Sequence, residues 1–244
     1  MSPNRIFGLA LAGLFAIAST GCVSMPEQQA YNRDAHANIK TIAVLETQPT
    51  RTTVMMLNHP GASFGLIGGL VAAADQSSKQ GKYDAILEKT QFEPLPYFRE
   101  RLTVHMAERG YTLVWPASQV QTGKVDRGSF GLRKAYAPTQ AADAQMDVNF
   151  GFVGYAAAGA GDGSPYRPTA TMAVRLVGPD GKQNYYTDYY AYNNVFNLQK
   201  AVVIDGDPKY VYPGFDDLEK AGTDSVEGLR LAIDALAARI AGQL

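Results

Sequence analysis

The sequence predicts an α+β fold, or a related α/β fold, in which helices pack on a mixed sheet within a single domain. Two observations lead to this prediction. Short segments rich in β-branched and aromatic residues, which are typical of strands, occur on both sides of an amphipathic helix in the first half of the chain. A second amphipathic helix ends the chain, so helices and strands are interspersed.

The first half of the chain predicts three strands and a helix. Residues 39–47 (IKTIAVLET), 52–57 (TTVMML) and 111–115 have the composition of strands. Residues 94–108 predict a helix, because apolar residues recur there at helical spacing. Its buried face is expected to consist of Leu95, Phe98, Leu102 and Met106. Gly110 follows at the position of a C-terminal cap.

The second half predicts an antiparallel meander. A short helix is expected within residues 132–145, and strands are expected at 147–157, 169–177 and 184–192. Residues 179–182 (PDGK) predict the turn between the last two strands, because proline pre-sets φ and glycine accepts positive φ.

A helix is predicted over residues 225–242. Its apolar face consists of Leu229, Ile233, Leu236 and Ile240. Asp224 and Glu227 have the spacing of a capping box, with aspartate in the position that serine or threonine usually takes.

The N-terminus predicts export. Residues 1–5 carry a positive charge, residues 6–18 are uncharged and apolar, and small residues follow. This combination is typical of a secretory signal peptide. The apolar run is too short to span a membrane as a helix, which needs ~20 residues. The single cysteine of the chain, Cys22, comes directly after Ser19-Thr20-Gly21.

This arrangement resembles the lipobox of bacterial lipoproteins. In that family the cysteine becomes the mature N-terminus and carries a diacylglycerol thioether and an N-acyl chain such as palmitate. The resemblance implies a signal peptide at residues 1–21, a lipidated N-terminus and tether at 22–38, and a periplasmic domain at 39–244. Val23, where aspartate would imply inner-membrane retention, implies the outer membrane. An ordinary secreted protein with an unmodified Cys22 is the alternative.

A second resemblance concerns residues 39–117. The strand IKTIAVLE, a helix and the string ERGYTLVWPA resemble the opening of small periplasmic lipoprotein domains. Examples are the curli secretion channel subunit, the peptidoglycan-synthase activator lipoproteins and the N-terminal domain of the Tol translocation protein. The resemblance implies an accessory role in envelope assembly or secretion.

Composition argues against several classes of function. The chain has 22 basic and 23 acidic residues and a net charge of −1, so it lacks the basic excess that nucleic-acid binding requires. Three scattered histidines and one cysteine give no zinc-site spacing, and Asp205-Gly206-Asp207 lacks the pattern of an EF-hand. We therefore expect no metal and no cofactor other than covalent lipid on Cys22.

Residues 61–65 (GASFG) fit Gly-x-Ser-x-Gly, the serine-hydrolase elbow. A catalytic Ser63 would need a histidine base and an orienting carboxylate. His59 precedes the serine, and His105 lies on the helix predicted at 94–108. The sequence therefore favours a protein that is not an enzyme, with a periplasmic serine hydrolase using Ser63 as an alternative.

The same segment has a second pattern. Gly61, Gly65, Gly69 and Ala73 are spaced by four, so on a helix they share one face of small residues that admits another backbone closely. No charged residue occurs from Ala62 to Ala74. Three interpretations are open: internal helix packing, an interface with a partner or a second copy, and a segment that enters the bilayer.

Tyrosines cluster in the strand predicted at 184–192. They are Tyr185, Tyr186, Tyr189, Tyr190 and Tyr192. On a strand they would populate both faces, so one set is expected in the core and the other is a candidate contact surface. Aromatic pairing within the sheet is the alternative.

These observations together predict an outer-membrane lipoprotein with a periplasm-facing binding or accessory domain. Its expected partners are the membrane, through the lipid anchor, and a protein, an envelope polymer or a second copy of the chain. A ring-forming subunit of an envelope secretion channel is the alternative in the same compartment.

Overall fold

A mixed sheet of seven strands forms the centre of the fold in the computed structural model, which describes residues 27–160 and 163–244. Cys22 and the predicted signal peptide lie outside the described residues. The strands are β1 (Thr41–Val44), β2 (Thr53–Asn58), β3 (Thr112–Val114), β4 (Ala144–Gly159), β5 (Arg167–Val177), β6 (Asn184–Tyr192) and β7 (Val202–Ile204). The single α+β domain predicted from the sequence is confirmed.

The long strand β4 organises the sheet. The strand order is β3-β1-β4-β5-β6-β7, and β2 also pairs with β4. Strands β1 and β2 run parallel to β4 and occupy opposite ends of one edge, while β5 covers the other edge in antiparallel pairing. The predicted meander of β4, β5 and β6 is confirmed, and Gly181 in the last turn has a φ of +73°.

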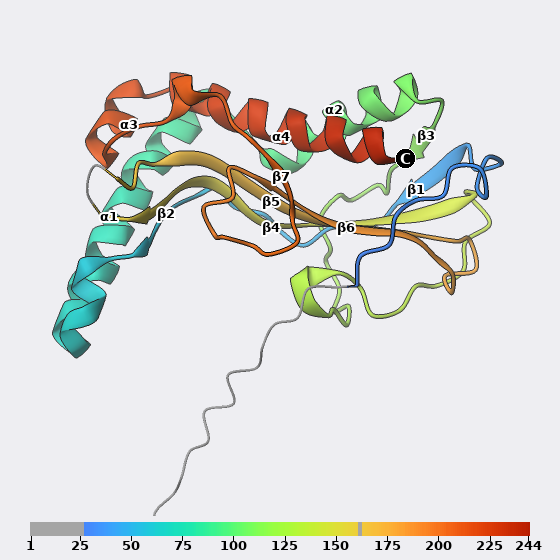
Figure 1. The fold of residues 1–244 in the computed structure, drawn as a ribbon, viewed down its shortest axis with the longest axis horizontal. Helices are drawn as coiled ribbons and strands as arrows, with labels where there is room; N and C mark the ends of the chain where they lie inside the picture. Colours follow the sequence, from blue (N-terminus) through green and yellow to red (C-terminus); the bar gives the residue numbers. More distant parts are fainter. Residues whose placement is uncertain (1–26, 161–162) are drawn as a thin grey trace, which may run out of the picture.

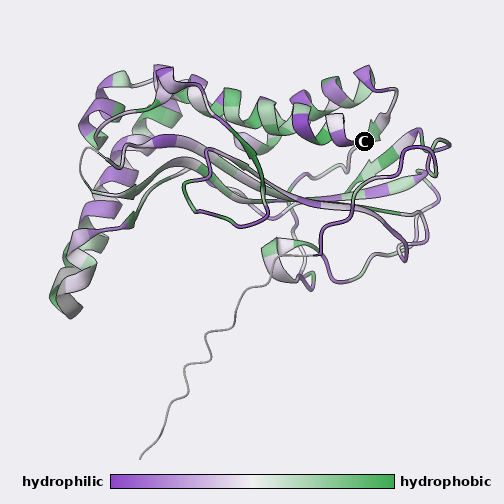
Figure 2. Ribbon diagram, in the orientation of Figure 1, coloured by the Kyte–Doolittle hydropathy of each residue, from purple (hydrophilic) through white to green (hydrophobic). Residues whose placement is uncertain are grey.

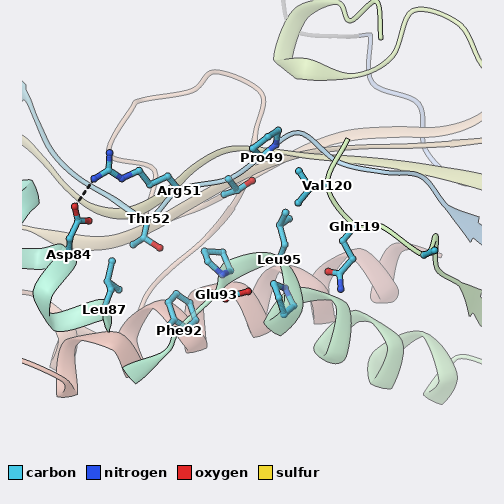
Figure 3. Close-up of a pocket in the computed structure, with 14 residues that line it drawn as sticks. Pro49, Arg51, Thr52, Asp84, Leu87, Phe92, Glu93, Leu95, Gln119 and Val120 are labelled. Carbon is cyan, nitrogen blue, oxygen red and sulfur yellow. Dashed lines mark hydrogen bonds and ion pairs between the residues drawn. The ribbon is translucent and has the colours of Figure 1, made fainter. Parts of the chain in front are cut away.

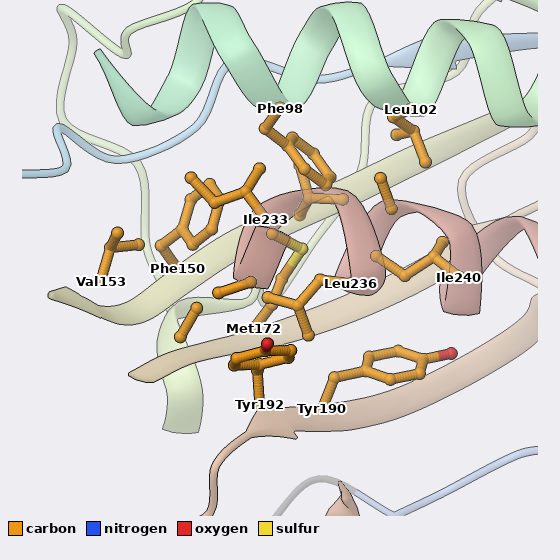
Figure 4. Packing of buried hydrophobic residues seen from close by; sticks show 14 of the residues in the cluster. Phe98, Leu102, Phe150, Val153, Met172, Tyr190, Tyr192, Ile233, Leu236 and Ile240 are labelled. Atoms are coloured by element: carbon orange, nitrogen blue, oxygen red, sulfur yellow. The ribbon is translucent and has the colours of Figure 1, made fainter. Parts of the chain in front are cut away.

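Two long helices cover one face of the sheet (Figure 1). The α-helices are α1 (Gly65–Thr90), α2 (Pro94–Glu108), α3 (Phe215–Ala221) and α4 (Asp224–Gln243), and the 3₁₀ helices are η1 (Pro60–Phe64), η2 (Ser129–Gly131) and η3 (Pro208–Tyr210). Helices α2 and α4 lie side by side on this face, and all eight residues of their predicted apolar faces are buried. Figure 4 shows Phe98 and Leu102 above Ile233 and Leu236, with strand side chains beneath.

A β-bulge in β4 changes which residues face these helices. The register with β5 shifts between Phe150 and Phe152, so Gly151 is the extra residue. Before the bulge Val148 belongs to the core, and after it Val153 and Tyr155 do, which reverses the alternation along the strand. A side-chain period of two therefore does not run through the whole strand.

The part of the β3–β4 connection around Leu132 packs on the opposite face of the sheet, against Ala173 and Tyr189. A short helix was expected within residues 132–145, and this expectation is wrong because the segment is irregular, with bends, until β4 begins at Ala144. The Arg133 N–H donates to Asp147 Oδ2 at 2.6 Å, and the Thr139 N–H donates to the Pro179 carbonyl at 2.8 Å. The backbone N–H groups of this segment therefore form hydrogen bonds with β4 and with the β5–β6 turn, and not with carbonyls of a helix.

Residues 27–38 are attached to the domain along much of their length, although they were expected to be a tether. Gln29 and Thr187 exchange two backbone hydrogen bonds of 2.9 and 3.0 Å. Arg33 Nε donates to the Leu244 carbonyl at 2.8 Å. Any free tether after Cys22 therefore ends before Gln29.

The start of α4 also differs from the prediction. Thr223 is the N-cap residue and makes no side-chain cap hydrogen bond, and Asp224 is already the first helical residue. The expected capping box with Asp224 at the cap is therefore wrong. Asp224 and Glu227 instead place negative charge in the first turn, where the helix dipole favours it.

Candidate functional site

Helix α1 is held to the domain by its C-terminal half. Tyr83 and Ile86 are buried in the core. Gln80 Oε1 accepts from the Val54 N–H at 2.8 Å, and Gln80 Nε2 donates to the Thr52 carbonyl at 3.1 Å. Gln76 bonds the Val54 carbonyl and, at 3.4 Å, the Met56 N–H. The two glutamines thus hydrogen-bond the backbone N–H and C=O groups along the free edge of β2, as a neighbouring strand would.

The other end of α1 extends away from the domain. Figure 1 shows this end reaching past the sheet on the side opposite α2 and α4. We call residues 65–74 the free end of α1. Three large apolar side chains of this end are exposed: Ile67 by 78 %, Leu70 by 64 % and Val71 by 58 %. These three, which we call the apolar stripe, fall at i, i+3 and i+4 and therefore share one helix face. In Figure 2 the free end is pale to green, and hydrophilic residues begin nearer the domain.

The predicted face of small residues only partly forms. Gly61 lies in η1 and precedes α1, so it is not on the same helix as Gly65, Gly69 and Ala73. Gly69 and Ala73 share their face with Gln76 and Gln80 by helical spacing, and so point away from the apolar stripe. A Cβ atom placed on Gly69 would meet no atom within 4 Å. Internal packing in the described fold therefore does not explain the glycine at position 69.

His59, the histidine nearest to Ser63 in the sequence, bonds to other groups. His59 Nδ1 accepts from the Gly61 N–H at 3.0 Å, so Nε2 carries the proton and faces Asp75 Oδ2 at 3.2 Å. Both nitrogens are thus engaged. Burial raises the pKa of Asp75, but hydrogen bonds from Lys79 and His59 outweigh it, so the pKa of this carboxyl lies below its usual value.

The two other histidines also contact residues other than Ser63. His105 lies on α2, and its Nε2 is 2.8 Å from Asp234 Oδ1 on α4. The ring of His36 lies 4.0 Å, centroid to centroid, from that of Tyr185. Among the described residues, no hydrogen bond joins Ser63 to a histidine, so the elbow motif is not accompanied by a triad.

The tyrosines of β6 face both sides of the sheet, as predicted, but four of the five are buried. These are Tyr186, Tyr189, Tyr190 and Tyr192. Tyr186 and Tyr190 hydrogen-bond through their hydroxyls, and the Tyr189 ring packs edge-on against Phe130 at 4.4 Å. Tyr185 is partly buried. Packing within the chain accounts for four of the five tyrosines, and Tyr185 alone remains partly exposed.

A groove opens where the β1–β2 connection meets the turn between α1 and α2 (Figure 3). Its volume is about 490 Å³, and its apolar wall includes Leu87, Phe92 and Leu95. At its rim Arg51 Nη2 pairs with Asp84 Oδ2 at 2.5 Å. Arg51 and Asp84 are therefore paired with each other, and Glu93 adds a further carboxylate to the lining of the groove. No sequence pattern indicated it, since its lining comes from separate segments.

A buried ionic cluster fixes the loop on the opposite face of the sheet. Asp147 is fully buried, and its Oδ1 lies 3.5 Å from Arg127 Nη1 and 3.8 Å from Arg133 Nε. Burial raises the pKa of the Asp147 carboxyl, although both arginines and the Tyr136 hydroxyl oppose the shift. All its partners belong to this loop, so its role is to hold the loop on β4.

Comparison with known proteins gives no assignment, because no protein-family model and no curated protein matches the chain. In the described ranges, 27–160 and 163–244, no cluster of three or more histidine, cysteine and acidic residues is arranged to hold a metal ion. No helix in that part of the chain is long and apolar enough to cross a membrane.

Proposed function

We propose that this protein is a lipoprotein of the bacterial outer membrane whose periplasm-facing domain binds another envelope component and catalyses no reaction. The observation that carries the proposal is the free end of α1, where Ile67, Leu70 and Val71 are exposed on a projecting helix. Exposed apolar side chains that lie together on one surface are a feature of interaction sites. The role is that of an accessory factor in envelope assembly or secretion.

The anchor in this proposal is lipid on Cys22, which the sequence between the apolar run and Val23 supports. The described part of the chain begins at residue 27, and Gln29 already pairs with β6. Two or more acyl chains make a stable anchor, since each buried methylene contributes ~0.8 kcal/mol. An anchored domain with an exposed apolar helix end is suited to binding at the membrane surface.

Fractionation of cells that produce the wild-type chain or the Cys22→Ser variant tests the proposal. The wild type is expected in the outer-membrane fraction, and Cys22→Ser is expected to fail maturation or to lose stable attachment. Equal distribution of the two proteins would refute the anchor. Ser63→Ala and Val71→Asp then separate the classes of function, because a hydrolase would lose activity in the first and a binding protein would lose complex formation in the second.

A second candidate is a ring-forming subunit of an envelope secretion channel. The observation that favours it is the empty space beside Gly69, which leaves room for the backbone of another copy. The native mass of the mature protein in mild detergent tests it. A large, discrete oligomer that Gly69→Leu abolishes would support a ring, and a monomer in both proteins would refute it.

A further inference from the structure

The free end of α1 has one chemical character. From Ala62 to Ala74 no residue is charged. Residues 65–74 would extend about 15 Å as helix. The first charged side chain along α1 is Asp75, which faces Lys79 at 2.6 Å, so the change from apolar to ionic is abrupt. Beyond its first turn a helix bonds its own backbone polar groups, which lets an apolar helix face contact lipid. The N–H groups of the first turn lack partners within the helix, so this end suits the polar boundary of the membrane rather than its apolar centre.

The position of the N-terminal segment limits where the membrane can lie. Residues 22–29 reach at most about 25 Å when fully extended. Gln29 is fixed to Thr187 of β6 by backbone hydrogen bonds of 2.9 and 3.0 Å. A lipid on Cys22 would therefore hold the domain close to the bilayer. Figure 1 shows the first described residues, in dark blue, on the same side of the sheet as the free end of α1.

We propose that the apolar stripe of α1, made of Ile67, Leu70 and Val71, inserts into the lipid surface of the membrane that carries the Cys22 anchor. The proposal deepens the proposed function, on which it rests, by naming the partner of the exposed stripe. The anchor and α1 then give the domain two separate attachments on one side of the sheet. The opposite side of the sheet carries α2 and α4 (Figure 1) and, in this proposal, is turned away from the membrane.

A second copy of the chain fits the stripe less well. A stable dimer buries about 1,600 Å² in total and uses 20–30 residues from each partner, whereas the stripe offers three large side chains on one projecting helix. An interfacial helix needs only to bury its apolar side chains ~5–10 Å into the boundary of head groups and acyl chains. Lipid accordingly matches both the small area and the lack of charge.

Flotation with vesicles of phosphatidylethanolamine and phosphatidylglycerol tests the proposal on the acyl-free chain of residues 23–244. The main core cluster begins at Ile39, so this chain contains the described fold. The wild type is expected to bind. Val71→Asp is expected to lower the partition coefficient at least about tenfold, because it replaces an apolar side chain that the proposal places in lipid with a charged one. Raising NaCl to 1 M is expected to leave binding unchanged, since the stripe carries no charge.

Val104→Asp is the matched control. Val104 lies on α2 and is 40 % exposed, against 58 % for Val71 on α1, so both substitutions add one charge at an exposed valine. The control is expected to bind like the wild type. No binding by the wild type, equal loss in both variants, or loss of binding at 1 M NaCl would overturn the proposal. So would a dimer of the acyl-free chain that Val71→Asp dissociates.

Mass spectrometry of the N-terminal peptide of the protein isolated from cells tests separately whether Cys22 is acylated. Acylated Cys22 without vesicle binding would refute the α1 contact and leave the lipoprotein proposal standing. Unmodified Cys22 together with vesicle binding would refute the lipoprotein proposal and support the contact of α1 with lipid.

Discussion

Gln80→Ala should weaken the attachment of α1 and therefore the whole domain. Gln80 accepts from the Val54 N–H at 2.8 Å and donates to the Thr52 carbonyl at 3.1 Å. Val54 is fully buried, so the variant leaves its N–H without a partner. An unmet buried donor costs about 1–3 kcal/mol, and the better helix propensity of alanine returns only a few tenths. We expect a net loss of about 2 kcal/mol in the free energy of unfolding.

Urea unfolding measures this loss, and hydrogen exchange of peptides that cover β2 locates it. The midpoint should fall in Gln80→Ala, and the Val54 amide should exchange faster. Ser78→Ala is the matched control, because Ser78 is exposed on the same helix. It should raise the midpoint slightly, through the better helix propensity of alanine, and leave exchange at Val54 unchanged. Unchanged exchange at Val54 in Gln80→Ala would refute the idea that α1 completes the edge of β2.

Three further predictions concern the core, the ionic contacts and the free end of α1. Leu236→Ala should lower the free energy of unfolding by about 2–5 kcal/mol in urea titration, since Leu236 is fully buried between α4 and the sheet; a loss below 1 kcal/mol would contradict the packing. Asp234 is partly buried, which raises its pKa, but hydrogen bonds from Arg101 and His105 outweigh burial and the pKa is lowered. The stability that ionised Asp234 contributes is therefore present above the unfolded-state pKa of about 3.9 and is lost as the pH falls through the folded-state pKa. Asp234→Asn should reduce stability at pH 7 and reduce its decline towards pH 3, and parallel pH profiles would argue against this linkage. Gly69→Ala should raise the melting temperature, because alanine favours a helix by ~1 kcal/mol and the new methyl group meets no atom; a lower value would reveal a contact within the chain.

The sequence predicts most of the secondary structure because the elements carry strong local signals. The helix at residues 94–108 matches α2, and Gly110 has a φ of +85°, as its cap position predicts. The order of the strands depends instead on pairing between distant residues. Nothing local reveals that β1 and β2 share an edge of β4, or that the bulge at Gly151 reverses the alternation along that strand.

The candidate site was only partly accessible from sequence. The uncharged run around Gly69 identified the unusual part of α1. The exposure of its side chains could not be predicted from the sequence, because an apolar helix has the same composition in a core and on a surface. The burial of four of the β6 tyrosines could not be read from the sequence for a related reason, since distant segments such as that around Phe130 cover the strand. The groove near Phe92 forms only when three segments of the chain meet.

Thiol labelling on intact outer membranes tests the central claim most directly. Cys22 is the only cysteine and should be blocked by lipid, so Val71→Cys and Val104→Cys would each carry one reactive thiol. In the membrane-bound protein we expect a water-soluble maleimide to label position 104 and to spare position 71. After solubilisation in denaturant both should react. Equal labelling of the two positions in membranes would contradict the account, because the free end of α1 would then lie in water.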